Sequence, residues 1–298
     1  MPARMLIHGL SFWALLRRLI WAVALLLAMP ALAVPAMWQA GKGASRVTIY
    51  GTVHALPAGQ DWLTPAAARA FAQADDLVVE VVMPQDPQAM SATVMRLGLL
   101  PEPSPILDRV PAEVRPQLAS LVQRSGVPPA AFDRMKSWFA ALTLVQMEMA
   151  RAGLDPAAGV DVTLVAKARA AGRRLVPLET PEGQLGLFDG LPEADQRLLL
   201  ASAVGDAAQA STQMQALVKA WATGDVERIL KDFDDASLSP AMYETLFKRR
   251  NAAWADWVQA SLKRPGRHFM AVGAAHMAGP DSLIAMLKAR RIKVRRVE

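Results

Sequence analysis

Two apolar segments near opposite ends of this 298-residue chain are each followed by the same Gly-x-x-His pattern. The first segment covers residues 47–50 and leads into Gly-x-x-His at residues 51–54; the second covers residues 268–272 and leads into the pattern at 273–276. Both segments have the apolar composition of buried strands. Because the chain has only four histidines, the doubled pattern predicts two strand ends that contribute to one shared site.

The first 33 residues have the features of a Sec signal peptide. Three arginines precede an apolar stretch over residues 19–33, which Pro30 interrupts and which ends in the small-x-small pattern of a cleavage site. The stretch is too short for a comfortable membrane span, which needs about 20 apolar residues. We therefore expect cleavage after Ala33 or Ala36 and a periplasmic or secreted chain without a stable membrane span. An uncleaved membrane anchor is the alternative.

Composition narrows the classes of function. The chain carries a net charge of +6, and three of its 33 basic residues leave with the leader, so the mature chain would carry a charge near +3. This slight excess argues against a nucleic-acid partner, and the basic cluster over residues 288–296 fits a solvated face at a helix end. The chain has no cysteine, which excludes disulfides, thiolate metal ligands and a cysteine nucleophile.

Strand and helix patterns alternate at the two ends of the chain, with mainly helical patterns between them. Strands are expected at residues 47–50, 77–82, 173–178, 268–272 and 293–297. We expect a single α/β domain over residues 34–298, with a largely parallel or mixed central sheet and helices on both faces. A large helical region at about residues 87–263 is inserted between the N- and C-terminal strands, and one continuous helix is expected over residues 130–152.

Four polar residues lie at or near the ends of these strands, namely His54, Glu80, Glu179 and His276. Ligand sites in open α/β sheets form outside the carboxyl ends of the strands, so we expect these side chains to converge. Two neutral imidazoles and two carboxylates can hold a divalent ion such as Mn²⁺, Zn²⁺ or Co²⁺. Such an ion polarises a carbonyl and lowers the pKa of bound water, so the set points to metal-assisted hydrolysis.

Each of these residues also has a structural interpretation. A histidine beside an apolar strand can be a hydrogen-bonded core residue, and Glu179 can complement the dipole of a helix that starts at Thr180 and Pro181. Glu80 lies within an apolar run, where burial without a partner would be costly, so it requires either a metal ion or a cationic side chain. His268 lies inside a strand and outside the doubled pattern, and we interpret it as structural.

Further short motifs follow one another along the mature chain. In order they are Ile49-Tyr50-Gly51-Thr52-Val53-His54, Leu77-Val78-Val79-Glu80, Gly159-Val160-Asp161, Leu178-Glu179-Thr180 with Gln184, Arg250-Asn251, and Val272-Gly273-Ala274-Ala275-His276-Met277-Ala278-Gly279. In this order and spacing they resemble the TraB/PrgY/GumN family, in particular its GumN-like bacterial branch, and through it the Tiki proteins. The resemblance implies an α/β core in which the paired motifs and a glutamate form one site.

Activity, cofactor and roles are also implied by this resemblance. Tiki members are divalent-metal-dependent proteases that favour manganese or cobalt, and zinc is also possible here. The expected metal ligands are His54, His276 and Glu80, with Glu80 as ligand or general base. The remaining family positions are expected to be catalytic, in the case of Glu179 and Arg250, or to contact substrate, in the case of Thr52, Asp161 and Asn251. Arg250 either binds a substrate carboxylate or pairs with Glu80 or Glu179.

Two functions are consistent with these features. The first is an exported metal-dependent hydrolase, and specifically a peptidase, that acts on a peptide or small-molecule substrate. The second is a non-catalytic periplasmic protein that binds a ligand in the same pocket, or an accessory protein associated with polysaccharide production.

Overall fold

The computed structural model describes residues 33–84, 86–205, 210–234 and 238–298. The expected signal peptide lies outside the described residues, apart from Ala33. Residues 33–298 form one unit. None of the helices in the described part of the chain is long and apolar enough to cross a membrane.

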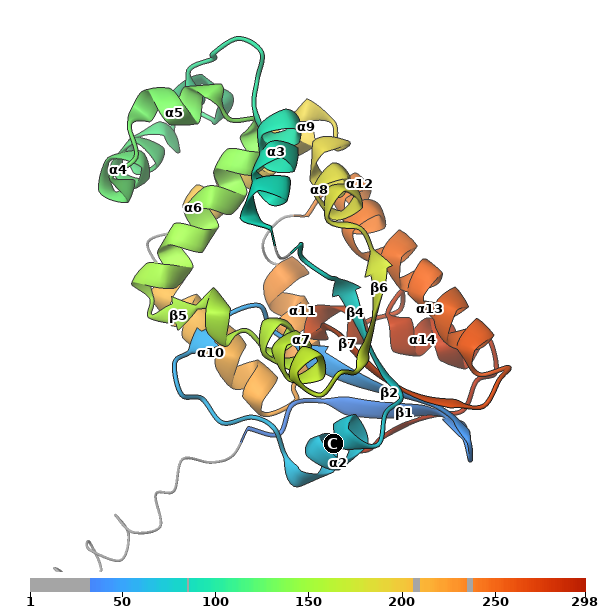
Figure 1. The fold of residues 1–298 in the computed structure, drawn as a ribbon. Coiled ribbons are helices and arrows are strands. Elements are labelled where there is room, and N and C mark those ends of the chain that lie inside the picture. Colours follow the sequence, from blue (N-terminus) through green and yellow to red (C-terminus); the bar gives the residue numbers. More distant parts are fainter. Residues whose placement is uncertain (1–32, 85, 206–209, 235–237) are drawn as a thin grey trace, which may run out of the picture. The chain divides into compact units, whose positions relative to one another are not determined.

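A mixed six-stranded sheet forms the centre of this unit (Figure 1). In spatial order its strands are β6 (Arg174–Glu179), β4 (Asp76–Val81), β7 (Gly266–Gly273), β2 (Ser45–Thr52), β1 (Met37–Lys42) and β8 (Val294–Arg296). The first four are parallel to one another, whereas β1 is antiparallel to both β2 and β8. The α/β class and the mixed sheet expected from the sequence are confirmed.

Helices cover both faces of the sheet (Figure 1). The helices next to it include α2 (Pro65–Ala72), α7 (Val160–Ala170), α13 (Arg249–Ser261) and α14 (Leu283–Ala289). Phe71 of α2 packs on Phe269 of β7, while Trp257 of α13 packs on the neighbouring His268. Successive side chains of a strand point to opposite faces, so α2 and α13 lie on opposite sides of the sheet.

The region between the N- and C-terminal strands is mainly helical. Its helices are α3 (Pro87–Gly98), α4 (Arg115–Ser125), α5 (Pro129–Arg134), α6 (Ser137–Arg151), α8 (Pro181–Asp189), α9 (Glu193–Gly205), α10 (Ala210–Ala222), α11 (Val226–Asp234) and α12 (Pro240–Tyr243). A short antiparallel pair, β3 (Leu56–Pro57) with β5 (Leu154–Asp155), joins this region to the loop after β2.

Two sequence-based expectations about element boundaries were wrong. The single helix expected over residues 130–152 is two helices, because Met135 adopts an extended backbone and pairs with Leu99 in an isolated β-bridge. The edge-proximal strand β1 was not expected, since its sequence contains no β-branched residue. It forms because it pairs with β2 along its whole length, from Met37 opposite Tyr50 to Lys42 opposite Ser45.

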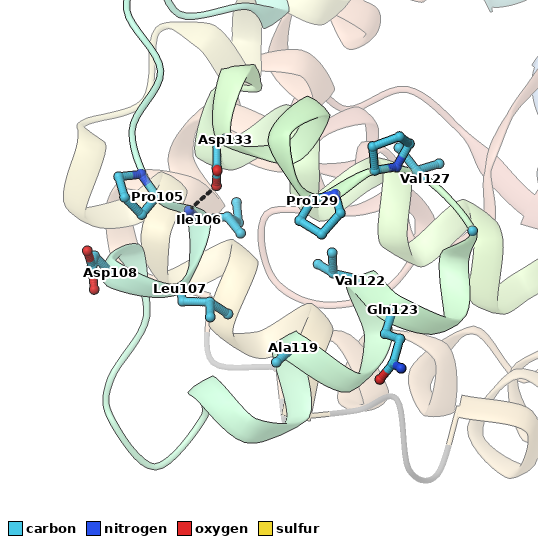
Figure 2. Close-up of a pocket in the computed structure, with 12 residues that line it drawn as sticks. Pro105, Ile106, Leu107, Asp108, Ala119, Val122, Gln123, Val127, Pro129 and Asp133 are labelled. Atoms are coloured by element: carbon cyan, nitrogen blue, oxygen red, sulfur yellow. Dashed lines mark hydrogen bonds between the residues drawn. The ribbon is translucent and has the colours of Figure 1, made fainter.

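The helical region has an apolar core of its own. Ile106, Leu118, Phe132, Leu144 and Leu200 are among its buried residues. Beside it lies a cavity of about 610 Å³ between the 3₁₀ turn η1 (Ile106–Arg109), α4 and α5, shown in Figure 2. None of the residues predicted for the functional site lines this cavity.

Replacement of Phe269 tests the main core that supports the sheet. Phe269 is fully buried and its ring lies 5.6 Å from that of Tyr50 and 5.4 Å from that of Phe71. We expect Phe269→Ala to lower the free energy of unfolding by about 3–5 kcal/mol because it leaves a cavity. Urea unfolding followed by circular dichroism measures the change. The control is Val162→Ala, at an exposed position on α7. It should change the free energy of unfolding by less than about 0.5 kcal/mol.

Candidate active site

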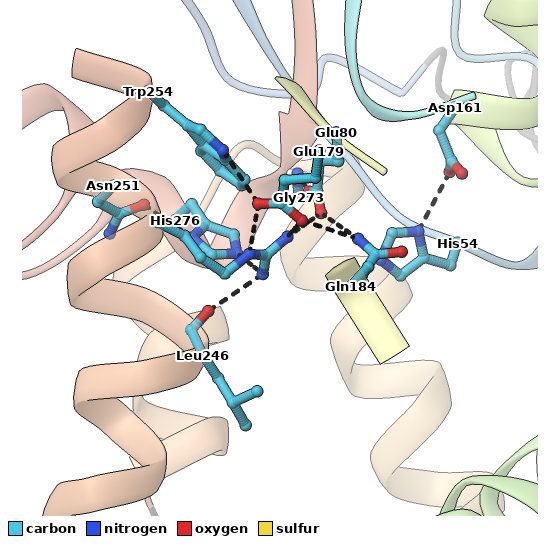
Figure 3. Close-up of polar contacts among 11 residues, drawn as sticks. His54, Glu80, Asp161, Glu179, Gln184, Leu246, Asn251, Trp254, Gly273 and His276 are labelled. Carbon is cyan, nitrogen blue, oxygen red and sulfur yellow. Dashed lines mark hydrogen bonds and ion pairs between the residues drawn. The ribbon is translucent and has the colours of Figure 1, made fainter. Parts of the chain in front are cut away.

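Three of the four residues predicted at strand ends lie in one cluster (Figure 3). Glu80 is one residue before the end of β4, Glu179 is the last residue of β6, and His276 lies in the 3₁₀ turn η5 (Ala274–Met277) directly after β7. Arg250, in the first turn of α13, contacts all three. The carboxyl ends of these parallel strands therefore converge, as expected for an α/β sheet.

The guanidinium of Arg250 binds both carboxylates. Its Nη2 donates to Glu80 Oε2 at 2.5 Å, and its Nε donates to Glu179 Oε1 at 2.8 Å. Its Nη1 donates to the carbonyl of Leu246 at 3.0 Å, in the π-helical turn η4 (Glu244–Lys248) before α13. Arg250 thus pairs with both glutamates. Its binding of a substrate carboxylate stays a prediction. None of the three charged side chains is more than 15% exposed.

Trp254 and Gln184 complete the cluster, although neither was assigned a role from the sequence. Trp254 Nε1 donates to Glu179 Oε1 at 3.1 Å, and the Arg250 guanidinium lies over its ring, 4.7 Å from the centroid. Gln184 of α8 reaches an oxygen of Glu80 and one of Glu179, both at 3.4 Å. The sequence feature that could have indicated Trp254 is its position four residues after Arg250, because this spacing puts both side chains on one face of a helix.

His276 is a neutral imidazole whose tautomer follows from its neighbours. Asn251 Nδ2 donates to the carbonyl of Asp281 at 2.8 Å, so its Oδ1 faces His276 Nδ1 at 2.7 Å. Nδ1 therefore carries the proton, and Nε2 presents its lone pair to Arg250 Nη1 at 3.1 Å. Burial, reinforced by the positive charge of Arg250, lowers the pKa of His276 to about 3 against the opposing effect of Glu80.

His54 lies at the exposed edge of the site. Its side chain is 67% exposed, and its Nδ1 is 3.3 Å from Asp161 Oδ1. The hydrogen bond to Asp161 raises the pKa of His54 above its ordinary value, an effect that water screens at this exposure. Among the described residues, no hydrogen bond or ion pair joins His54 to the Arg250 cluster. The two histidines that the sequence placed in equivalent positions therefore differ in exposure and in hydrogen-bond partners.

Two of the three residues expected to contact substrate hold a histidine ring in this structure, and the third is buried. Asp161 holds His54 Nδ1, and Asn251 holds His276 Nδ1. Thr52 is 2% exposed, and its buried hydroxyl has no hydrogen-bond partner within the described part of the chain. Their roles in substrate binding stay predictions.

The donor set suits a divalent cation, although the side chains are not arranged around one. Among the described residues, no group of three or more histidine, aspartate or glutamate side chains is placed to hold a metal ion. The positively charged guanidinium of Arg250, and not a metal ion, binds the carboxylates of Glu80 and Glu179. The chemistry nevertheless fits, because His54 and His276 each have Nδ1 held by an oxygen, the arrangement that orients metal-binding histidines.

Glu80 makes the stability of the protein sensitive to acid. Burial by itself raises the pKa of Glu80, but the basic side chains around it and the N–H of Gly273, 2.7 Å from Oε1, outweigh burial and lower the pKa to about 2. A carboxylate with a lowered folded-state pKa stabilises the protein above its ordinary pKa of 4.5. This stabilisation is lost as the pH falls through about 2.

Glu80→Gln should remove that acid-sensitive part of the stability. We expect a loss of about 1–3 kcal/mol at pH 7, because a charged hydrogen bond to Arg250 is weakened, and a flatter profile of unfolding free energy between pH 5 and pH 2. Urea titrations in metal-free buffer with EDTA measure it. The exposed Glu113→Gln is the matched control. An unchanged profile in Glu80→Gln would contradict the assignment.

Gly159 fixes the loop that carries His54. A Cβ atom at this position would lie 2.4 Å from the carbonyl oxygen of His54, and Val160 N donates to the carbonyl of Val53 at 3.0 Å. We expect Gly159→Ala to cost about 1–3 kcal/mol and to shift the NMR signals of the His54 ring, because the backbone must move apart. Gly186→Ala in α8, where a Cβ meets no atom within 4 Å, should leave the His54 signals in place.

Comparison with known proteins shows the family to which the chain belongs. The sequence profile of the TraB/PrgY/gumN family matches residues 36–296. The chain is 25% identical over 273 residues to the uncharacterized protein YbaP of Escherichia coli (strain K12), and equally to that of Shigella flexneri, covering 86% of this chain and 98% of each relative. No solved structure matches the chain. Because the profile spans most of its length, the chain belongs to the TraB/PrgY/gumN family.

Proposed function

We propose that this chain is an exported metal-dependent hydrolase, and specifically a peptidase. Family membership and the leader-like N-terminal sequence support the proposal. The observation that carries it is the state of His276: a neutral ring, with Nδ1 held by Asn251 and the Nε2 lone pair facing Arg250 Nη1 beside the two carboxylates. A histidine must be in this protonation state to bind a metal ion.

His54, Glu80 and His276 are the residues that would hold the ion. The ion would supply polarisation of a substrate carbonyl and a lower pKa for bound water. Mn²⁺ and Co²⁺ are the candidates favoured by the family resemblance, and Zn²⁺ is compatible with the same nitrogen and oxygen donors.

The other polar residues would prepare these groups. Arg250 pairs with Glu80 and Glu179 and compensates the cost of burying their carboxylates. Asn251 keeps the proton of His276 on Nδ1, and Asp161 orients the ring of His54. Arg250, Asn251 and Asp161 would therefore be positioning residues, because each acts on another side chain of the site.

Access to the site would come from the side of His54. On the opposite side, the rings of Trp254 and Phe247 lie 4.5 Å and 5.0 Å from that of His276 and shield it from water. His54 is exposed, so it would be the first site residue that a peptide meets. Its Nε2 would remain available while Nδ1 is held by Asp161.

The test is metal content together with cleavage. The purified chain is loaded with Mn²⁺, Co²⁺ or Zn²⁺, passed through gel filtration and measured by inductively coupled plasma mass spectrometry, and a peptide library is assayed with each ion. We expect stoichiometric metal and cleavage in the wild type. His54→Ala, Glu80→Gln and His276→Ala should each weaken metal affinity about tenfold or more and abolish cleavage.

His268→Gln is the matched histidine control for metal content. His268 bonds Asp76 near the start of β7, away from the carboxyl ends of the strands, so this variant should retain the metal. Unchanged metal content in His54→Ala and His276→Ala would refute the metal site. Metal binding without cleavage of any peptide would refute the peptidase, and a ligand that co-purifies without turnover would favour the non-catalytic binding protein.

A further inference from the structure

A second polar site lies at the opposite end of the central sheet. The parallel strands β2 and β7 begin there, and their registers place Arg46 directly beside Arg267. Thr52 and Gly273, at the carboxyl ends of the same strands, adjoin the active-site cluster. Six residues of extended strand span about 20 Å, so the two sites share no side chain.

A cavity of about 330 Å³ opens between this end of the sheet and α2. On the sheet side, Gln39 is paired with Thr48 on β2 and with Arg295 on β8, so the three residues share one face. On the helix side, Arg69 and Gln73 lie one turn apart. No carboxylate is among the described residues that line the cavity.

The lining is strongly basic. Four arginines contribute to it, namely Arg46, Arg69, Arg267 and Arg295. Within the described ranges, none of these arginines forms an ion pair with an aspartate or glutamate, for which the nitrogen and oxygen would lie within 4.0 Å of each other. Arg295 belongs to the C-terminal basic cluster and donates to Gln39 Oε1 at 3.1 Å. The Nε of Arg46 is buried and has no hydrogen-bond partner in the described part of the chain.

Asp75 and Asp76, which follow Ala74 of the cavity lining in the sequence, are engaged elsewhere. Asp76 accepts from Arg174 at 2.5 Å and is 2.7 Å from His268 Nδ1. Asp75 accepts from the backbone N–H of Arg267 at 2.8 Å, which leaves the guanidinium of that residue without a charged partner. Arg69 lies in the last turn of α2, where a cation also suits the helix dipole, so the argument rests mainly on Arg46 and Arg267.

We propose that this cavity binds a small phosphate-bearing anion. The planar guanidinium fork matches phosphate oxygens, and Thr48 with Gln39 and Gln73 adds neutral hydrogen-bonding groups. The volume lies at the small end of the range for ligand pockets. A bound anion would offset the repulsion among the like charges of the lining.

Pyrophosphate is the probe for this site, with inorganic phosphate as the weaker one. Isothermal titration of the full chain, in EDTA and at fixed ionic strength, should give saturable binding, and pyrophosphate should raise the melting temperature. Arg46→Gln and Arg267→Gln should each weaken the Kd at least about tenfold, because each removes a charged hydrogen bond. Arg46→Lys should bind with intermediate affinity, since it keeps the charge and loses the fork.

Arg264→Gln is the matched control, because it removes an equal charge from an exposed arginine three residues before Arg267 that does not line the cavity. Its Kd should stay within about twofold of the wild type. Equal weakening in Arg264→Gln would indicate binding to diffuse charge, and the absence of saturable binding would indicate solvated arginines only; either result overturns the proposal. Because EDTA removes metal, neither outcome bears on the proposed metal-dependent activity.

Discussion

The ion pairs of Arg250 with Glu80 and Glu179 are the constraint on which the rest of the site depends. They join α13 to the ends of β4 and β6, two neighbouring parallel strands, through side chains that are almost fully buried. Loss of the guanidinium would leave two buried carboxylates without a compensating cation, so Glu80 and Glu179 both depend on Arg250. Burial keeps the ring of His276 neutral, and the guanidinium beside its Nε2 reinforces that state.

The sequence predicted the convergence of these residues but not the inequality of the two histidines. Apolar runs and the parallel-sheet rule placed His54 and His276 at neighbouring strand ends. In the structure, Thr52 pairs with Gly273, so the two Gly-x-x-His patterns are out of step by one residue. The chain then turns into η5 after β7, burying His276, whereas after β2 it runs outward toward β3 and leaves His54 exposed.

Other features depended on contacts that no local pattern encodes. The break between α5 and α6 arises because Met135 pairs with Leu99 from a distant segment, although the sequence around it is compatible with a continuous helix. The pairing of Arg250 with the two glutamates likewise depends on where α13 lies relative to the strand ends. Glu80 was different, since a carboxylate inside an apolar run requires a compensating cation in any fold, and Arg250 is that cation.

The two ends of the sheet differ in charge, and the difference follows from strand direction. At the carboxyl ends, Glu80 and Glu179 face one guanidinium and a neutral imidazole, which leaves an excess of one negative charge before His54 is counted. At the amino ends, arginines line a cavity without a carboxylate in its described lining. A separation of about 20 Å exceeds the Debye length of about 8 Å in physiological salt, so water-exposed charge at one end has little influence at the other. One sheet can therefore attract a cation at one end and an anion at the other, with each site adjusted by its own residues.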